Sequence, residues 1–505
     1  MQYLQQGIKG LTHCFNDKSM HWVSHSLNIL VFEIFGTNAY GWHFTLLAWH
    51  SLNALLLTSL IYHLAEWHQL KKARSVAVVA TLLWLVSPYH TDAVVWGGAM
   101  LHLAVSSFML AGMLCFIQYI ETRRSTYTFQ TYLWYLLAMF TLENFLIFPV
   151  LLLVIYILHL QVQKRSANLP VVKHYLLPFV CLNVIYLIAN KFYMDEWVGH
   201  YGEDAHLNTD VLLLVPNLTK YLSKMLYFPL FFSYEVRDHL YALLHKPKTV
   251  YVALVFYTVL FSTLIYFFFK TKKTTLQLAI GLFAFCCVAM LPVISTYFAY
   301  SKEIEGDRYF YFLSLFFYAA LAVVLSWLGK KTQLFITLSL IIISIFFLYR
   351  NNSYWYESGN YANSLMHDFK WPTAKRVYVL LSPDSYRGAY CLRNKPEGTL
   401  TEMLYVQRGL DMNGKMIEAY QWNAMSPDDS ASCTIIDSNT LEIKLHSNGG
   451  WLWYKSFGAT NTENDFFKTT LNEWYPQYTI QFKQKQNGDV FIFANNKKWQ
   501  QINNF

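Results

Sequence analysis

Charged side chains are scarce in this chain. Asp, Glu, Lys and Arg make up 14% of its 505 residues, whereas a soluble domain usually carries about 25% charge. Hydrophobic residues reach 55% of the total, and many gather in long runs such as 250–269 and 334–348. Each of these runs can cross most or all of a hydrocarbon core about 30 Å thick. A chain of this composition cannot cover itself with a charged surface, so the sequence predicts an integral membrane protein.

Cysteine motifs are also missing. The seven cysteines are scattered without the paired spacing of a zinc site, and most lie in or near apolar runs, where cysteine behaves as a small hydrophobe. Cys391 and Cys433 lie in the polar last third of the chain and can pair if that part faces an oxidising compartment. No cofactor follows from the sequence, which leaves a divalent metal open.

The net charge of +8 does not indicate nucleic-acid binding, because Lys and Arg stand in short clusters between apolar runs. Every second loop between these runs is short and basic, which is the pattern that orients a multi-pass protein with its basic loops in the cytoplasm. The predicted spans lie near 41–64, 76–88, 100–120, 131–143, 145–160, 175–194, 249–269, 276–298, 310–328 and 334–350.

This orientation places both Met1 and Phe505 on the non-cytoplasmic side. Residues 1–40 lack the charged start, apolar run and cleavage site of a signal peptide, and 21–36 is predicted to be an interfacial amphipathic helix. The orientation therefore favours a first span that precedes this sequence over a span concealed within residues 1–40. The expected location is the inner membrane of a bacterium, with the C-terminal part in the periplasm.

The predicted fold class is a polytopic α-helical membrane protein with a small C-terminal α+β or β-rich soluble domain on the non-cytoplasmic side. The transmembrane domain covers 41–350 and includes a long outer loop, 195–248, in which 211–232 is expected to form an in-plane helix. The soluble domain covers 351–505. Within it, 399–410 is predicted to be helical and 479–494 to be a hairpin turning at Asn487-Gly488-Asp489.

Ionisable residues at the ends of spans are costly in lipid and are therefore candidates for function. Pro88 should end a helix and leave His90 and Asp92 at the mouth of the bundle. Glu143 stands in a short outer turn, and Arg308 opens a later span, where a guanidinium can bind a phosphate bidentately. For the histidines within the spans, polar contacts inside the bundle are the simpler interpretation. These histidines are His43, His50 and His102.

Several short motifs follow one another along the chain. In order, they are Tyr40-Gly41-Trp42-His43, residues 50–56, the Pro-x-His-x-Asp-Ala-Val stretch 88–94, Glu143 with Pro149, and the Asp-Arg-Tyr-x-Tyr-x-x-Ser stretch 307–314. This order resembles the membrane glycosyltransferases of the GT-C superfold. Among these, the resemblance is closest to the protein O-mannosyltransferase-like group whose eukaryotic members carry tetratricopeptide tails. It covers about residues 20–350, and the C-terminal tail has no part in it.

The resemblance implies transfer of a sugar from a polyprenyl-phosphate donor to a protein, lipid or glycan acceptor at the outer membrane face. The main catalytic Asp of the family follows its first span, and this sequence begins beyond that position; the family's Arg-Pro is His21-Trp22 here. The roles that the resemblance implies are catalysis for Asp92 and Glu143, phosphate binding for Arg308 and His90, and support for Asp307, Tyr309, Tyr311 and His43.

Two other functions remain open. A catalytically silent relative would act as a scaffold of an envelope or secretion complex and bind its partners through the outer domain. A transporter is the third class, although transporter sites usually lie near the midplane and polar residues here gather at the outer ends of spans. Transfer chemistry requires one shared site, so we expect Arg308 within a sugar-phosphate's reach of Asp92 or Glu143.

Overall fold

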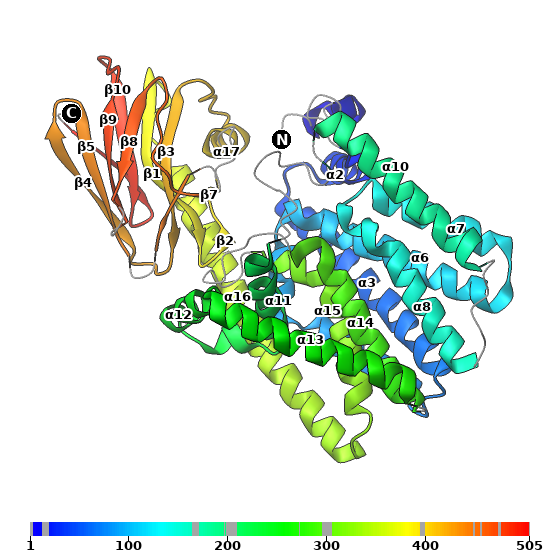
Figure 1. Ribbon diagram of the computed structural model, residues 1–505. Coiled ribbons are helices and arrows are strands. Elements are labelled where there is room, and N and C mark those ends of the chain that lie inside the picture. Colours follow the sequence, from blue (N-terminus) through cyan, green and yellow to red (C-terminus); the bar gives the residue numbers. More distant parts are fainter. Residues whose placement is uncertain are drawn as a thin grey trace. The chain divides into compact units, whose positions relative to one another are not determined.

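The structure is a computed structural model in which the chain divides into two compact units. The first ends at Tyr349 and the second begins at Arg350. Figure 1 shows the helices of the first unit in blue to green and the strands of the second in yellow to red. The residues that the structure describes are 4–12, 20–163, 171–195, 197, 210–271, 273–294, 306–393, 399–447, 450–454, 457–472, 476–503 and 505. Residues 196 and 198–209 of the predicted outer loop and the basic stretch 164–170 lie outside them.

The first unit is helical throughout its described part. Its elements are η1 (Leu4–Leu11), α2 (Trp22–Phe35), α3 (Ala39–Trp67), α4 (Ala73–Leu85), η2 (Pro88–His90), α5 (Thr91–Val95), η3 (Gly97–Ala99), α6 (Met100–Thr122), α7 (Ser125–Met139), η4 (Glu143–Ile147), α8 (Phe148–Gln163), η5 (Val172–Leu176), α10 (Leu177–Met194), α11 (Val211–Met225), η7 (Phe228–Phe231), α12 (Tyr234–Leu244), α13 (Pro247–Lys270), α14 (Thr274–Ile294), η8 (Asp307–Tyr309), α15 (Phe310–Leu325) and the part of α16 (Lys330–Asp368) up to Tyr349. The rest of α16 belongs to the second unit.

Eight of the described helices are long and apolar enough to cross a membrane, which is compatible with a multi-pass membrane protein. A ninth crossing is formed if α4 counts together with η2 and α5, which continue it after a bend of 57°. The sequence predicted ten crossings, and the difference lies at 131–143. This stretch belongs to α7, whose 15 residues span about 22 Å at a rise of 1.5 Å per residue and therefore fall short of the bilayer core.

The helices differ in how much of their apolar surface is buried. Helix α6 lies at the centre, with 78% of its most apolar window inside the protein, whereas only 6% of the corresponding window of α13 is buried. The outward face of α13 carries large apolar side chains such as Val252 and Phe256, which are 71% and 60% exposed. An apolar outer surface of this extent is typical of helices that face lipid.

Two glycines allow helices to pack closely around α8. A Cβ atom at Gly112 of α6 would stand 2.8 Å from the ring of Phe148, and one at Gly281 of α14 would stand 2.6 Å from a methyl group of Leu158. Small residues at helix contacts are a common way for membrane helices to gain dispersion energy. The bundle around α8 therefore depends on these two missing side chains.

Helix α11 occupies the second half of the predicted outer loop. It packs against α13, α14 and α15 and buries Pro216, Asn217 and Tyr221 together with two lysines. Figure 1 shows it beside α15 and α14. The helix predicted for 211–232 is present but shorter, because it ends at Met225 and a 3-10 turn follows.

The second unit contains two sheets. The larger has the strand order β11-β10-β1-β3-β6-β7, with β2 paired to β1, and the smaller has the order β4-β5-β9-β8. Strand β1 runs parallel to both β10 and β3. The elements are β1 (Arg376–Tyr386), β2 (Ala389–Tyr390), α17 (Thr399–Arg408), β3 (Met416–Ala424), β4 (Ser430–Asp437), β5 (Thr440–His446), β6 (Leu452–Tyr454), β7 (Phe457–Gly458), β8 (Phe467–Leu471), β9 (Gln477–Phe482), β10 (Asp489–Asn495) and β11 (Lys498–Gln501).

Aromatic side chains join the two sheets. Tyr420 of β3 meets Tyr478 of β9 edge to face with ring centroids 4.5 Å apart, and Tyr378 of β1 contacts Phe482 of β9 at 5.1 Å. Edge-to-face pairs of this kind stabilise beyond the area they bury. The second unit is therefore a β-rich domain with one shared core, as the sequence predicted.

The predicted hairpin over 479–494 is wrong. Strand β9 belongs to the smaller sheet and β10 to the larger one, so the chain crosses between sheets at the Asn-Gly-Asp turn. Arg376 fixes the place of β10, because its guanidinium donates to both carboxylate oxygens of Asp489 at 2.9 and 2.6 Å. The helix predicted for 399–410 is confirmed as α17.

The cysteines of this unit do not form the disulfide considered above. Cys391 and Cys433 are both free thiols. Burial raises the pKa of the Cys433 thiol to about 12, and the pKa of Cys391 is also raised. Both residues therefore behave as small, partly buried hydrophobes.

Glu418 on β3 should make the stability of the second unit depend on pH. Burial raises the pKa of its carboxyl group from 4.5 to about 7, and both oxygens are enclosed without a hydrogen-bond partner in the described structure. The folded state therefore holds a proton more tightly than the unfolded state, so stability falls as pH rises from 4.5 to above 7. We expect Glu418→Gln to stabilise the unit by about 3 kcal/mol at pH 8.5 and little at pH 4.5.

Hydrogen exchange of the strands in the intact protein measures this difference. Glu402→Gln is the matched control, because Glu402 is an exposed residue of α17. Equal protection of the wild type and Glu418→Gln at pH 8.5 would contradict the prediction.

Candidate functional site

A break in one helix creates the candidate site. Pro88 cannot continue α4, since it lacks the N–H that a helix requires, and the chain turns by 57° into η2 and α5. This turn brings Asp92 into the bundle, where only 1% of the residue is exposed. The sequence predicted a helix end at Pro88, and the structure places the following residues inside the protein rather than in an open loop.

Arg308 is the partner of Asp92, although 216 positions separate them in sequence. The Nη1 atom of Arg308 lies 3.1 Å from Oδ2 of Asp92, and the backbone N–H of Arg308 donates to the same oxygen at 3.2 Å. The guanidinium also stands over the rings of Trp96 and Tyr309, with centroid distances of 4.9 and 4.7 Å. Two residues that were expected to share a site are therefore in direct contact.

A second ion pair adjoins the first. Asp307 precedes Arg308 in sequence, and its carboxylate accepts a hydrogen bond from the ammonium group of Lys224 on α11. Both side chains are almost fully buried, and Lys224 lies 5.4 Å from the ring centroid of Tyr89. Charges therefore alternate through the cluster in the order Lys224, Asp307, Arg308, Asp92. We call these four residues the charged quartet.

Lys220 lies one helical turn before Lys224 and is also buried. Its ammonium group stands 4.8 Å from the ring centroid of Tyr241. Burial, and then the charge of Lys224, lower the pKa of Lys220 to about 7. The sequence analysis missed both lysines. Their signal was present, because two lysines four positions apart within the apolar stretch 211–232 must share one helix face.

Glu143 has a different partner from Asp92. Its carboxylate lies 3.0 Å from Nε2 of His21. Burial opposes protonation of His21, but the charge of Glu143 and the hydrogen bond to it prevail, so the pKa of His21 is raised. His102 of α6 interacts electrostatically with Arg308, Glu143 and His21. One member of the Asp92–Arg308 pair and both members of the His21–Glu143 pair therefore act electrostatically on His102.

Of the remaining candidates, His50, His90 and Tyr311 are buried in the bundle. Nε2 of His90 forms a 2.9 Å hydrogen bond with the Ser314 hydroxyl, and Nδ1 of His50 forms one of 2.9 Å with the Tyr311 hydroxyl. The rings of His90 and Tyr311 are 5.0 Å apart. His43 is exposed on α3 and makes no hydrogen bond or ion pair with any described residue. Polar packing within the bundle thus describes His50, whereas His43 does not join the cluster.

The described residues contain no group of three or more His, Cys, Asp or Glu side chains placed to hold a metal ion. What the cluster offers chemically is a set of buried cations beside carboxylates. Guanidinium and ammonium groups bind phosphate oxygens through short charge-assisted hydrogen bonds, and a neighbouring carboxylate can accept a proton.

Comparisons of the chain with protein-family models, with curated proteins and with solved structures found no match.

The ion pair of His21 and Glu143 should hold α2 more firmly at low pH. Because the pKa of His21 is raised in the folded state, its contribution is complete below pH 6.5 and is lost as pH rises through the raised value. We expect His21→Gln to speed hydrogen exchange in α2 strongly at pH 6, by the equivalent of about 1–2 kcal/mol, and only weakly at pH 9.

The exposed His43 offers the matched control, His43→Gln, which should leave exchange in α2 unchanged at both pH values. If His21→Gln altered exchange equally at pH 6 and pH 9, the pair would be shown to act without its charge.

Proposed function

We propose that this chain is a multi-pass membrane glycosyltransferase that transfers a sugar from a polyprenyl-phosphate donor to a protein, lipid or glycan acceptor. The proposal includes the predicted orientation, with the charged quartet at the outer face and the second unit on the same side. It also adopts the resemblance to the GT-C superfold drawn from the sequence motifs.

The observation that carries the proposal is the buried contact between Asp92 and Arg308. Moving a charge from water into an apolar bundle costs several kcal/mol per ion, so charged residues within membrane helices usually serve a function. A structural link needs one such pair, whereas this cluster holds two pairs side by side. Two cations converging on one place fit a phosphate group better than a neutral ligand.

The reaction assigns a task to each part of the quartet. An acceptor hydroxyl attacks the anomeric carbon of the sugar, and the bond between that carbon and the phosphate oxygen breaks. The electron pair of this bond stays on the phosphate oxygen, so the lipid leaves as polyprenyl phosphate and its phosphate gains one negative charge. Arg308 and Lys224 would stabilise this charge, as fixed cations do where charge develops. Of the residues assigned from sequence, His90 bonds to Ser314 and would support the site through this contact.

A carboxylate must take the proton of the acceptor hydroxyl. Asp92 is the better candidate, because it contacts the residue assigned to the phosphate. In the structure, Arg308 donates a hydrogen bond to the Oδ2 atom of Asp92. A phosphate that attracts the guanidinium would free this oxygen, and the carboxylate could then act as a base. Donor binding and activation of the acceptor would then be coupled. Glu143 with His21 would position the acceptor.

A catalytically silent scaffold is the competing function, and one observation favours it. Each acid of the quartet already holds a cation, so the two pairs can serve as permanent links between α11, α5 and the start of α15. The two functions differ in what the variants below should do.

Variants of Asp92 and Arg308 should separate donor binding from turnover. Arg308→Gln should weaken binding of a polyprenyl-phosphate sugar at least about tenfold, since it removes charged hydrogen bonds to the phosphate. Asp92→Asn keeps a hydrogen-bond acceptor for Arg308 but removes the base. We expect it to bind the donor normally while turnover falls about 10²- to 10⁴-fold.

The measurement uses membrane vesicles that contain the full chain, supplied with decaprenyl-phosphate-linked glucose, mannose or N-acetylglucosamine labelled in the sugar. Transfer of the label to a non-lipid or new lipid product reports turnover, and native mass spectrometry of purified protein reports binding. Arg124→Gln, in the exposed turn between α6 and α7, is the control. If the wild type neither binds nor transfers any of these sugars, the scaffold function becomes the better explanation.

A further inference from the structure

A surface pocket lies at the other end of α4 from Asp92. It occupies about 340 Å³ between α3 and α4, a volume within the usual range for ligand pockets of about 300–1,000 Å³. Its lining residues are Thr58, Tyr62, Arg74, Ala77 and Val78. Because the broken helix separates this pocket from the quartet, the two sites are distinct.

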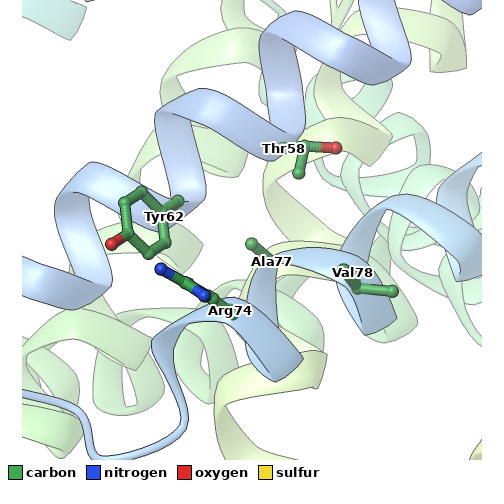
Figure 2. Close-up of a pocket in the computed structure, with 5 residues that line it drawn as sticks. All are labelled: Thr58, Tyr62, Arg74, Ala77 and Val78. Carbon is green, nitrogen blue, oxygen red and sulfur yellow. The ribbon is translucent and has the colours of Figure 1, made fainter.

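The pocket has one polar and one apolar end. Figure 2 shows the guanidinium of Arg74 next to the ring of Tyr62, with Thr58, Ala77 and Val78 farther along the two helices. The hydroxyl of Thr58 bonds to the Ala54 carbonyl and to Thr81, both at 2.8 Å. This hydroxyl is therefore satisfied within the protein, and the far end of the pocket presents mainly methyl groups.

The depth of the pocket matches the boundary of a bilayer. Tyr62 lies about 7 Å and Thr58 about 13 Å along α3 from its last residue, Trp67, at 1.5 Å per residue. Trp67 donates to Glu121 at 2.6 Å, and tryptophan is enriched at the level of lipid headgroups. The polar end of the pocket therefore stands close to the interface, and the apolar end reaches toward the hydrocarbon core.

The charge at this end of the helices is positive. Residues 66–74 contain Lys71, Lys72 and Arg74 against a single acid, Glu66. Arg74 is exposed and Ala77 is buried, so the pocket offers an exposed cation next to an apolar wall. A ligand that complements both features carries an anionic group joined to a hydrocarbon chain.

We propose that this pocket binds an anionic phospholipid of the membrane, with its phosphodiester at Arg74 and Tyr62 and one acyl chain along Thr58, Ala77 and Val78. The guanidinium donates two hydrogen bonds to the phosphate oxygens, and the Tyr62 hydroxyl donates a third. The site requires that the helices span a bilayer, but it does not depend on sugar transfer.

Native mass spectrometry of the full-length protein in detergent tests the site. The protein is titrated with dioleoyl phosphatidylglycerol or with dioleoyl phosphatidylcholine, which share their acyl chains. We expect the first phosphatidylglycerol molecule to bind more tightly than the phosphatidylglycerol molecules that follow it and more tightly than phosphatidylcholine. Its affinity should be about tenfold lower in Arg74→Gln. Val78→Trp leaves the charge in place and fills the apolar end, so it should also weaken this binding.

The basic residue Arg124, which lies outside the pocket, supplies the control Arg124→Gln, and this variant should bind as the wild type does. Equal affinity for the two lipids, or an equal loss in Arg124→Gln and Arg74→Gln, would overturn the proposal. The outcome of the lipid titration does not depend on whether the Arg308 variant transfers sugar, because the donor assay reports on a different site.

Discussion

The arrangement of the first unit depends on the cost of leaving a charge unpaired inside an apolar bundle. Asp92, Asp307 and Lys224 are almost completely buried, and Arg308 is only 13% exposed. Removing one partner of such a pair typically costs about 3–5 kcal/mol, a large share of a protein's net stability. The break at Pro88, the entry of α15 and the position of α11 are therefore coupled, because the first supplies Asp92, the second Asp307 and Arg308, and the third Lys224. A shift of any of these elements would leave a buried charge without its counter-ion.

The sequence predicted the parts of this arrangement that follow from local chemistry. Long apolar runs marked most of the helices, and Pro88 marked the break. The prediction failed at α7, where an apolar stretch of 13 residues indicated a crossing although the helix is too short for one. Hydropathy reports how apolar a stretch is and not where a helix begins and ends, so it could not give the bounds of α7. The passage of the chain from one sheet to the other was also not visible in the sequence. Residues 479–494 satisfy the local rules of a hairpin, but the ion pair of Arg376 with Asp489 accompanies the pairing of β10 with β1 in the larger sheet.

For the candidate site, the sequence identified acidic and basic residues by their position at helix ends. It also predicted that Asp92 and Arg308 share one site. The spacing of Lys220 and Lys224 placed both on one face of α11, but whether that face turns toward Asp307 depends on packing, so the contact of Lys224 with the cluster could not be foreseen. Nor could the sequence assign Glu143 to His21, because the two are 122 positions apart and belong to different elements. The residues whose role was predicted lie at the starts of helices, and those that were missed lie within α11. Position along a helix is visible in a sequence, whereas the direction of a face depends on packing.

The alternation of charge within the quartet also limits the chemistry that the site can perform. Each cation already has a carboxylate, so an incoming anion must compete with Asp92 or Asp307 rather than fill an empty position. The two acids differ in this respect. Asp307 holds Lys224 in a fully enclosed pair, whereas Asp92 holds Arg308, whose guanidinium is partly exposed and rests on the faces of Trp96 and Tyr309. A guanidinium supported by two rings can turn from a carboxylate to a phosphate while its charge stays stabilised. If the proposed donor binds, the pair formed by Asp92 and Arg308 is therefore the one that its phosphate would open, while the pair formed by Asp307 and Lys224 would keep the helices in place.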